Sequence, residues 1–231
     1  YVVYDDSLQH IIQGLWPSGE YFGDGSGGVY TSSPTLRRCS SAVVLMSTSS
    51  SSVVANSNHH KTRFSCAMPL PGNRQTVVRA ETYGLFMLVH HACEGAALIY
   101  YLDCRPVYDT YNKGMSRAIL SKDADLFLAI FTTINEKHLD LIVKWLPSHL
   151  NDPEKRKKLK VPVPDWVTDF HIAGNQSADD AASVCARYNQ IPEHVAKPVL
   201  HRINQIQQIQ KRLSAVGLAF DRQSNKPNEP K

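Results

Sequence analysis

One continuous apolar segment, residues 97–102, limits the folds open to this chain of 231 residues more than any other feature. Its sequence, Ala-Leu-Ile-Tyr-Tyr-Leu, does not alternate between apolar and polar residues, which is typical of a strand buried on both faces of a parallel sheet. Apolar residues at helical spacing precede it at 77–94 and follow it at 123–135, and residues 139–146 form another strand pattern. This alternation predicts an α/β domain with a mixed sheet covered by helices.

Three shorter strand patterns come before these elements, at residues 20–24, 42–46 and 61–67. A serine-rich stretch at 47–52 has the low complexity of a hairpin tip between two of them, and Pro69 ends the pattern. We therefore expect an antiparallel meander that leads into the parallel strands.

The composition indicates a reducing, intracellular setting. The five cysteines are odd in number and contain no Cys-x-x-Cys pair, so neither a disulfide framework nor a zinc ribbon is expected. The net charge of +4 permits a polyanionic partner without requiring one. No apolar segment approaches the roughly 20 residues that cross a bilayer, so no membrane partner is expected. The chain starts without Met or a signal-peptide pattern, which indicates a segment of a longer protein.

Four parts are expected along the chain. Residues 1–17 form an N-terminal extension, and residues 18–190 form a globular domain with a basic, proline-rich insertion at 151–171. Apolar residues at three- and four-residue steps then predict an amphipathic helix over 191–221, before a disordered tail at 222–231. That helix is expected to dock on the domain, to begin a further domain, or to pair with another chain.

Four acidic residues stand where an apolar strand ends or a helix begins: Asp24, Glu81, Asp103 and Asp179. Open α/β sheets bind ligands at the carboxyl ends of their strands, so folding is expected to bring these side chains together. Asp179 lies in the first turns of a helix predicted over 176–188, which Gly174 and Asn175 precede. Hard divalent cations prefer such oxygen clusters, and we therefore predict a metal site.

The sequence around each acid resembles, in chain order, the motifs of the ribonuclease H type 1 domain, including the versions in retroelement polyproteins. Asp24 lies in Asp-Gly-Ser, Glu81 in Arg-Ala-Glu, and Asp103 in Tyr-Leu-Asp-Cys, while Lys-Trp-Leu-Pro-Ser-His is similar to the family's Trp-Val-Pro-Gly-His. Gly-Asn-Gln-Ser-Ala-Asp matches Gly-Asn-Glu-x-Ala-Asp and assigns the fourth carboxylate to Asp179 rather than Asp180. The resemblance extends over residues 21–188.

This resemblance implies a five-stranded mixed sheet, with three antiparallel strands followed by parallel strands and helices on both faces. It also implies an endonuclease that hydrolyses the RNA strand of RNA/DNA hybrids and leaves 5′-phosphate and 3′-hydroxyl ends. Its partners are expected to be the hybrid and flanking domains of a larger polyprotein. Two alternatives stay open: an inactive nucleic-acid-binding or tethering module, and an integrase- or transposase-type nuclease, which uses three main acids and usually a final Glu.

The implied cofactor is a pair of Mg²⁺ ions, with Mn²⁺ as a substitute, and the implied ligands are the four acids. Two divalent ions about 3.5–4 Å apart activate a water and stabilise the leaving 3′ oxygen. Asp24 and Asp103 are expected near both ions, Glu81 near one and Asp179 near the other. Without metal the acids repel one another, which is expected to raise some of their pKa values.

A histidine that assists water delivery or product release is also implied, and two residues compete for this role. His149 has the family's local motif but is separated from Asp179 by the basic insertion, whereas His171 lies close to Gly174 without the motif. Because imidazole titrates near neutral pH, either could handle a proton. We favour His149, with His171 as the alternative.

Nucleic-acid contacts are expected from backbone and polar groups near the acids and from the basic insertion. Where cellular relatives have Gln-Thr-Asn-Gln before Arg-Ala-Glu, this chain has Gln75, Thr76, Val77 and Val78, so a side-chain amide expected to contact the RNA 2′-hydroxyl is missing. A Lys- and Trp-rich handle between Asp103 and Asp123 is also missing, and the insertion could substitute for it. The predicted contacts are Gly25, Ser26, Gly27, Gln75, Thr76, Arg79, Asn175, Lys155, Lys157 and Lys158.

Overall fold

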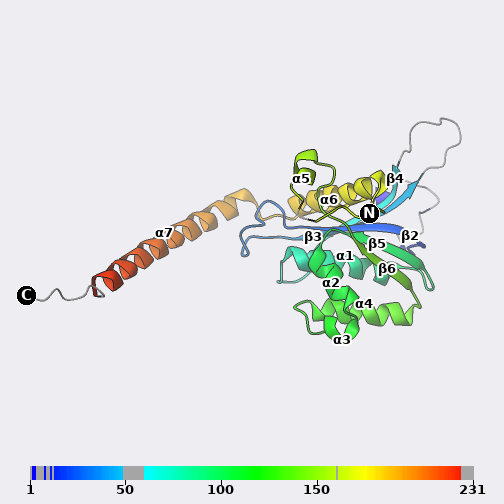
Figure 1. Ribbon diagram of the computed structural model, residues 1–231, viewed down its shortest axis with the longest axis horizontal. Helices are drawn as coiled ribbons and strands as arrows, with labels where there is room; N and C mark the ends of the chain where they lie inside the picture. The colour runs from blue at the N-terminus through cyan, green and yellow to red at the C-terminus, as the bar shows by residue number, and fades with distance from the viewer. Residues whose placement is uncertain are drawn as a thin grey trace, which may run out of the picture. The chain divides into compact units, whose positions relative to one another are not determined.

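The computed structural model describes residues 2–3, 8, 11, 13–48, 60–159 and 161–224 (Figure 1). Most of the predicted hairpin tip at 47–52 and of the predicted tail at 222–231 lies outside these residues. The chain divides into two units, Tyr1–Gln190 and Ile191–Lys231, which are described separately below.

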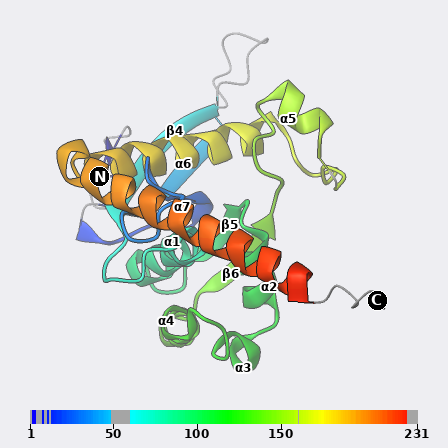
Figure 2. The ribbon, with the colours of Figure 1, turned by 90° about the vertical axis from the view of Figure 1, so that its left-hand side faces the viewer.

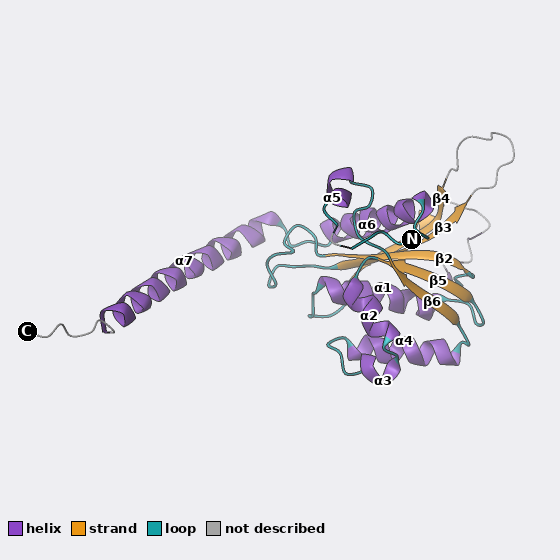
Figure 3. Cartoon of the chain, in the orientation of Figure 1, coloured by secondary structure: helices purple, strands orange, loops and turns teal. Residues whose placement is uncertain are grey.

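In the first unit, six strands of the described chain form one sheet in the order β1-β4-β3-β2-β5-β6 (Figure 3). β2 pairs with β3 and β3 with β4 in antiparallel fashion, while β2, β5 and β6 run parallel to one another. The predicted mixed sheet, with three antiparallel strands followed by parallel strands, is therefore confirmed, and the short β1 adds a sixth strand to the five that were predicted. The strands are β1 (Val2–Val3), β2 (Gly19–Ser26), β3 (Ser40–Thr48), β4 (His60–Pro69), β5 (Ala97–Leu102) and β6 (Asp140–Trp145).

The helices cover both faces of the sheet, as predicted. α6 (Asp169–Tyr188) lies on one face, whereas α1 (Val77–His91) and α4 (Ala124–Glu136) lie on the other, and the two ribbon views agree (Figures 1 and 2). α1 begins where the Thr76 hydroxyl accepts a hydrogen bond from the Arg79 amide, which satisfies one of the amides left free at a helix start.

The segment at 97–102 is buried on both faces, as its composition predicts. In β5, the side chains of Leu98 and Tyr100 belong to the core beneath α1 and α4. Tyr101 belongs to the second core, under α6, where its ring stacks on Phe22 at a centroid distance of 4.8 Å. Burial of apolar surface on both faces of the sheet, to which β5 contributes on each side, is the dominant favourable term in folding such a three-layer domain.

Several elements differ from the sequence-based expectations. The structure contains α2 (Arg105–Asn112), α3 (Met115–Ala118) and α5 (Pro153–Lys157), none of which was predicted. α6 begins at Asp169 instead of 176, because Thr168 and His171 form a capping box at its start. Gly174 thus lies inside the helix, where it faces Phe22: a Cβ at this position would approach the Phe22 ring to 2.5 Å.

The described part of the N-terminal extension contributes to the fold. Val2–Val3 pairs with β4, and Trp16 is fully buried, with its ring 4.9 Å from the Phe64 ring in an edge-on arrangement. Such aromatic pairs add to the stability gained from burial. The core of the first unit therefore begins before residue 18.

The second unit contains one long helix, α7 (Glu193–Ser224). It includes Pro198, which removes one hydrogen bond from the helical ladder near its start. Among the helices of the described residues, none combines the length and the apolar character that crossing a membrane requires.

Candidate metal centre

Three of the four predicted acids converge at the carboxyl ends of the central strands. Asp24 lies in β2, Asp103 directly follows β5, and Glu81 lies in α1 beneath them. β2 and β5 are parallel neighbours in which Gly23 pairs with Leu102, so the residues after this pair, Asp24 and Asp103, stand side by side. Each of the three carboxylates has an oxygen within 4.8 Å of an oxygen of the other two.

Gly25 allows α1 to approach β2 closely enough for this arrangement. A Cβ built on Gly25 would lie 2.8 Å from the Glu81 backbone nitrogen, a distance that real side chains do not tolerate. The glycine in the Asp-Gly-Ser motif therefore sets the distance between the strand with Asp24 and the helix with Glu81.

The three carboxylates are held in conditions that disfavour their charged forms. Burial, followed by repulsion from Asp103 and Asp179, raises the pKa of Asp24 to about 7. Burial, followed by the Asp24 charge, raises the pKa of Glu81 well above its ordinary value. Burial also raises the pKa of Asp103, although the Asn175 amide, 3.4 Å away, and the His149 charge counteract this effect.

One oxygen in the cluster has no hydrogen-bond partner in the described chain. Glu81, only 3% exposed, keeps its Oε2 buried and unpaired, and the Asn175 Oδ1 is in the same situation. An unpaired buried carboxylate oxygen is costly unless something else satisfies it. Close, acceptor-only oxygens with excess negative charge are the ligands that hard divalent cations prefer, so this donor set fits such an ion.

The fourth predicted acid, Asp179, lies on α6 beside this cluster. Its charge raises the pKa of both Asp24 and Asp103, and its Oδ1 accepts a hydrogen bond of 3.3 Å from Ser183. The three-carboxylate cluster itself does not include it.

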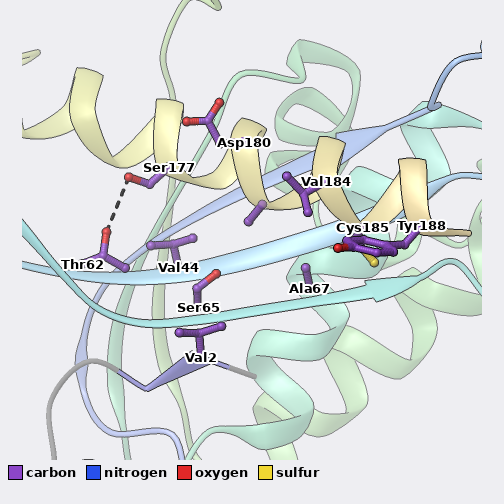
Figure 4. Close-up of a pocket in the computed structure, with 11 residues that line it drawn as sticks. Val2, Val44, Thr62, Ser65, Ala67, Ser177, Asp180, Val184, Cys185 and Tyr188 are labelled. Atoms are coloured by element: carbon purple, nitrogen blue, oxygen red, sulfur yellow. Dashed lines mark hydrogen bonds between the residues drawn. The ribbon is translucent and has the colours of Figure 1, made fainter.

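Asp180 has different surroundings. It accepts a hydrogen bond from Gln176 at 2.8 Å and lines a pocket of about 550 Å³ between α6 and strands β1, β3 and β4 (Figure 4). Thr62 and Ser177 are joined by a hydrogen bond across this pocket. These contacts favour Asp179 over Asp180 as the acid that faces the cluster.

The two candidate histidines have contrasting environments. His149, in the turn after β6, adopts a left-handed backbone with φ of 56°, and its charge acts on Asp103. The ring of His171 instead lies among the rings of Phe22, Tyr101 and Trp166. Its Nδ1 accepts a hydrogen bond of 3.0 Å from the Thr168 amide, so His171 serves the start of α6.

Two of the predicted nucleic-acid contacts are engaged inside the protein. The side chain of Gln75 accepts a hydrogen bond from the Cys39 amide at 2.7 Å and donates to two carbonyl groups, of Leu70 and Gly72. Arg79 forms ion pairs with Asp123, at 3.0 Å, and with Asp125 on α4. These contacts connect α1 to its neighbours, and they leave the two side chains little capacity to bind a ligand.

The other residues predicted to contact nucleic acid fall into two groups, one around the carboxylate cluster and the start of α1, and the other on α5 and directly after it. Thr76 caps α1, Ser26 lies 3.3 Å from Ser183 on α6, and a Cβ on Gly27 would approach Thr31 to 2.2 Å. Asn175 bonds to Asp103. Exposed basic side chains lie on α5 and directly after it: Lys155, Lys157 and Lys158.

Two residues near the cluster were not identified from the sequence. Trp145 donates a hydrogen bond of 2.9 Å from its indole nitrogen to the Asp103 carbonyl oxygen. Cys104 follows Asp103, and burial raises the pKa of its thiol to about 11, so the thiol is neutral at pH 7 in the metal-free chain. The motif Lys-Trp-Leu-Pro-Ser-His contained the signal for Trp145, because it places this residue at the end of β6.

Comparisons with known proteins agree with this architecture. No protein-family model matches the sequence, and no curated protein matches it. The PFV RNase H domain in solution superimposes with a TM-score of 0.53 at 16% identity, over 76% of this chain and 97% of that domain. LC9-RNase H1, a type 1 RNase H with the type 2 active-site motif, gives a TM-score of 0.50 at 12% identity, over 77% of this chain and 76% of that chain.

A third structure, a mutant of the Prototype Foamy Virus protease–reverse transcriptase, gives a TM-score of 0.51 at 15% identity. The match covers 74% of this chain and 21% of that chain, so this protein matches about a fifth of the length of the viral one. The chain therefore has the RNase H-like fold.

Proposed function

We propose that this chain is a metal-dependent endonuclease that hydrolyses the RNA strand of RNA/DNA hybrids. One observation carries the proposal: Asp24, Glu81 and Asp103 bring oxygens within 4.8 Å of one another at the carboxyl ends of β2 and β5, in an RNase H-like fold. Because a fold alone hosts several chemistries, the carboxylate cluster is the stronger part of the argument.

Within this proposal the acids have distinct positions. Asp24 and Asp103 would bind both ions, Glu81 would bind on the α1 side, and Asp179 would bind on the α6 side. Bound Mg²⁺, or Mn²⁺ in its place, supplies Lewis-acid activation of a water and charge stabilisation at the phosphate. Asn175 orients Asp103 through its 3.4 Å hydrogen bond. His149, whose charge acts on Asp103, is proposed to handle a proton at the site.

We further propose that the chain is a segment of a retroelement polyprotein with flanking domains. The match to part of a viral protease–reverse transcriptase supports this origin. The exposed lysines on α5 and directly after it are proposed to bind the phosphate backbone of the hybrid, since clustered exposed lysines attract polyanions.

The test is cleavage of an end-labelled RNA/DNA hybrid with Mg²⁺ or Mn²⁺, alongside duplex DNA and duplex RNA. The wild-type chain should cut only the RNA strand of the hybrid. Asp103→Asn and Asp179→Asn should each reduce the rate by more than about 100-fold, as expected when a group that acts in the transition state is lost. Asp180→Asn is the matched control, since Asp180 lines the separate pocket, and should keep the wild-type rate.

Other outcomes decide between the alternatives. A folded chain that binds the hybrid but cuts nothing would favour the tethering module. Cutting of duplex DNA would favour the integrase- or transposase-type reaction. Equal losses in Asp179→Asn and Asp180→Asn would overturn the assignment of the fourth acid.

A further inference from the structure

The α7 helix carries a stripe of exposed apolar side chains. Ile206, Ile209, Leu213, Val216 and Phe220 are each more than half exposed. Large apolar side chains gathered on one exposed helix face usually mark an interaction surface.

The spacing of this stripe is that of a coiled coil. From Val199 to Phe220 the positions 199, 202, 206, 209, 213, 216 and 220 alternate in steps of three and four residues. A strict seven-residue repeat keeps the same seam toward a partner helix over its whole length, whereas a helix that packs on a globular domain has a wider stripe. Six of the seven seam positions are apolar, and Arg202 is the exception.

We propose that α7 pairs with α7 of a second copy of this chain. The apolar area of the seam supports a stable pair: pairing would remove about 400–700 Å² of surface from water on each helix if the six apolar side chains became buried. Two copies together then reach about 800–1,400 Å², close to what specific interfaces bury. Of the two basic residues near the middle of the helix, Lys211 lies opposite the seam and Arg212 beside it, so neither side chain occupies the seam itself.

Arg202 determines the orientation of the pair. In a parallel pair the two Arg202 side chains would face each other at the same level of the seam, which like charges disfavour. An antiparallel pair centred near residue 211 places Arg202 of one copy beside Phe220 of the other, where a guanidinium over an aromatic ring is attracted to it. The pair is therefore antiparallel.

Sedimentation velocity of the full chain over a range of concentrations tests the pairing. The wild type should change from monomer to dimer as its concentration rises to about 100 µM, and Ile206→Glu should bind its copy at least 100-fold more weakly. Gln208→Glu adds the same charge off the seam and should behave as wild type. Ile206→Leu should keep the dimer, and matching circular dichroism spectra would show that every variant keeps its helix.

Other results would overturn the proposal. A wild type that stays monomeric over the whole range, or an Ile206→Glu variant that dimerises normally, would exclude this interface. A monomer whose α7 binds phosphatidylserine vesicles would assign the stripe to a lipid surface instead. The orientation is tested by mixing wild type with Arg202→Glu. Only a parallel pair would bring the two residues 202 together, so only a parallel pair would favour a mixed dimer of arginine with the introduced glutamate. The mixture should therefore form no excess of mixed dimers.

Discussion

At the scale of single residues, the carboxylate cluster lowers the stability of the metal-free protein. Asp24 has its pKa raised from 3.8 to about 7 in the folded chain. A group with a raised pKa contributes stability that is complete below about pH 4 and is lost as the pH rises to about 7. At pH 8 the charged Asp24 therefore destabilises the fold when no cation is bound.

Asp24→Asn should consequently stabilise the metal-free protein, although it removes a predicted ligand. We expect the free energy of unfolding to rise by a few kcal/mol at pH 8 and by less at pH 5, where the wild-type carboxyl is mostly protonated. Thermal unfolding in EDTA at the two pH values measures this. Asp180→Asn should change stability by less than about 0.5 kcal/mol at either pH, and an equal gain in both variants would contradict the explanation.

The two histidines should separate activity from stability. His149→Ala should lower the cleavage rate about 10- to 100-fold, as for the loss of a proton-handling group, without a change in melting temperature. His171→Ala should cost about 1–2 kcal/mol of stability, because it removes the capping box and ring contacts, and should leave the rate of the folded enzyme unchanged. The reverse pattern would move the proton-handling role to His171.

The sequence located the acids of the site better than its polar contacts. Asp24, Glu81 and Asp103 each lie in a recognisable motif, so their convergence could be predicted from short stretches. Gln75 and Arg79 could not be interpreted in this way, because their partners, the Cys39 amide and Asp123, lie 36 and 44 residues away along the chain. Only the folded chain shows that these side chains hold α1 in place.

At the scale of elements, the contact between β2 and α1 sets the geometry of the cluster. Gly25→Ala should push Glu81 away from Asp24, since the added Cβ would lie 2.8 Å from the Glu81 backbone nitrogen. We expect a loss of about 1–3 kcal/mol in stability together with most of the cleavage activity. Gly217→Ala, where a Cβ would meet no atom within 4 Å, is the control and should retain both. Full activity in Gly25→Ala would show that the cluster tolerates a displaced helix.

The strands were predictable because burial on one or both faces leaves a clear pattern, and the missed helices lacked such a pattern. α2 buries only Val107 and α5 buries nothing, so neither has an apolar stripe that the sequence could reveal. Gly174 and Asn175 suggested a helix boundary, but close packing against Phe22 requires glycine inside α6. Tertiary contact overrides local preference at that point.

The basic side chains of α5 and of Arg79 should differ in their response to salt. Replacing Lys155, Lys157 and Lys158 by Gln should reduce the slope of log binding constant against log salt by about 1 to 3, since each phosphate contact contributes about 0.9. Arg79→Gln should leave that slope unchanged and lower the melting temperature, because Arg79 pairs with Asp123, just before α4, and with Asp125 in its first turn. Titration of hybrid binding at several salt concentrations measures both, and an unchanged slope in the triple variant would exclude α5 from the interface.

At the scale of the whole molecule, the two proposals assign separate tasks to the two units. The first unit contains the carboxylate cluster and a core that buries Trp16, Tyr100 and Phe22. The second contains α7 with its exposed seam. Two copies joined through α7 would carry two cutting sites on one particle, which raises the effective concentration of the second site on a long hybrid.

A chain that ends at Gln190 should therefore separate these tasks. Because the first unit has its own core, we expect the shortened chain to melt within about 2 °C of the full one, which corresponds to about 0.5–1 kcal/mol for a domain of this size. It should cut short hybrids at the wild-type rate and sediment as a monomer. On long hybrids it should lose any gain in cleavage rate that the dimer obtains from its second site. A fall of more than about 5 °C would show that the first unit needs the second for stability, and a dimer that survives the truncation would place the interface outside α7.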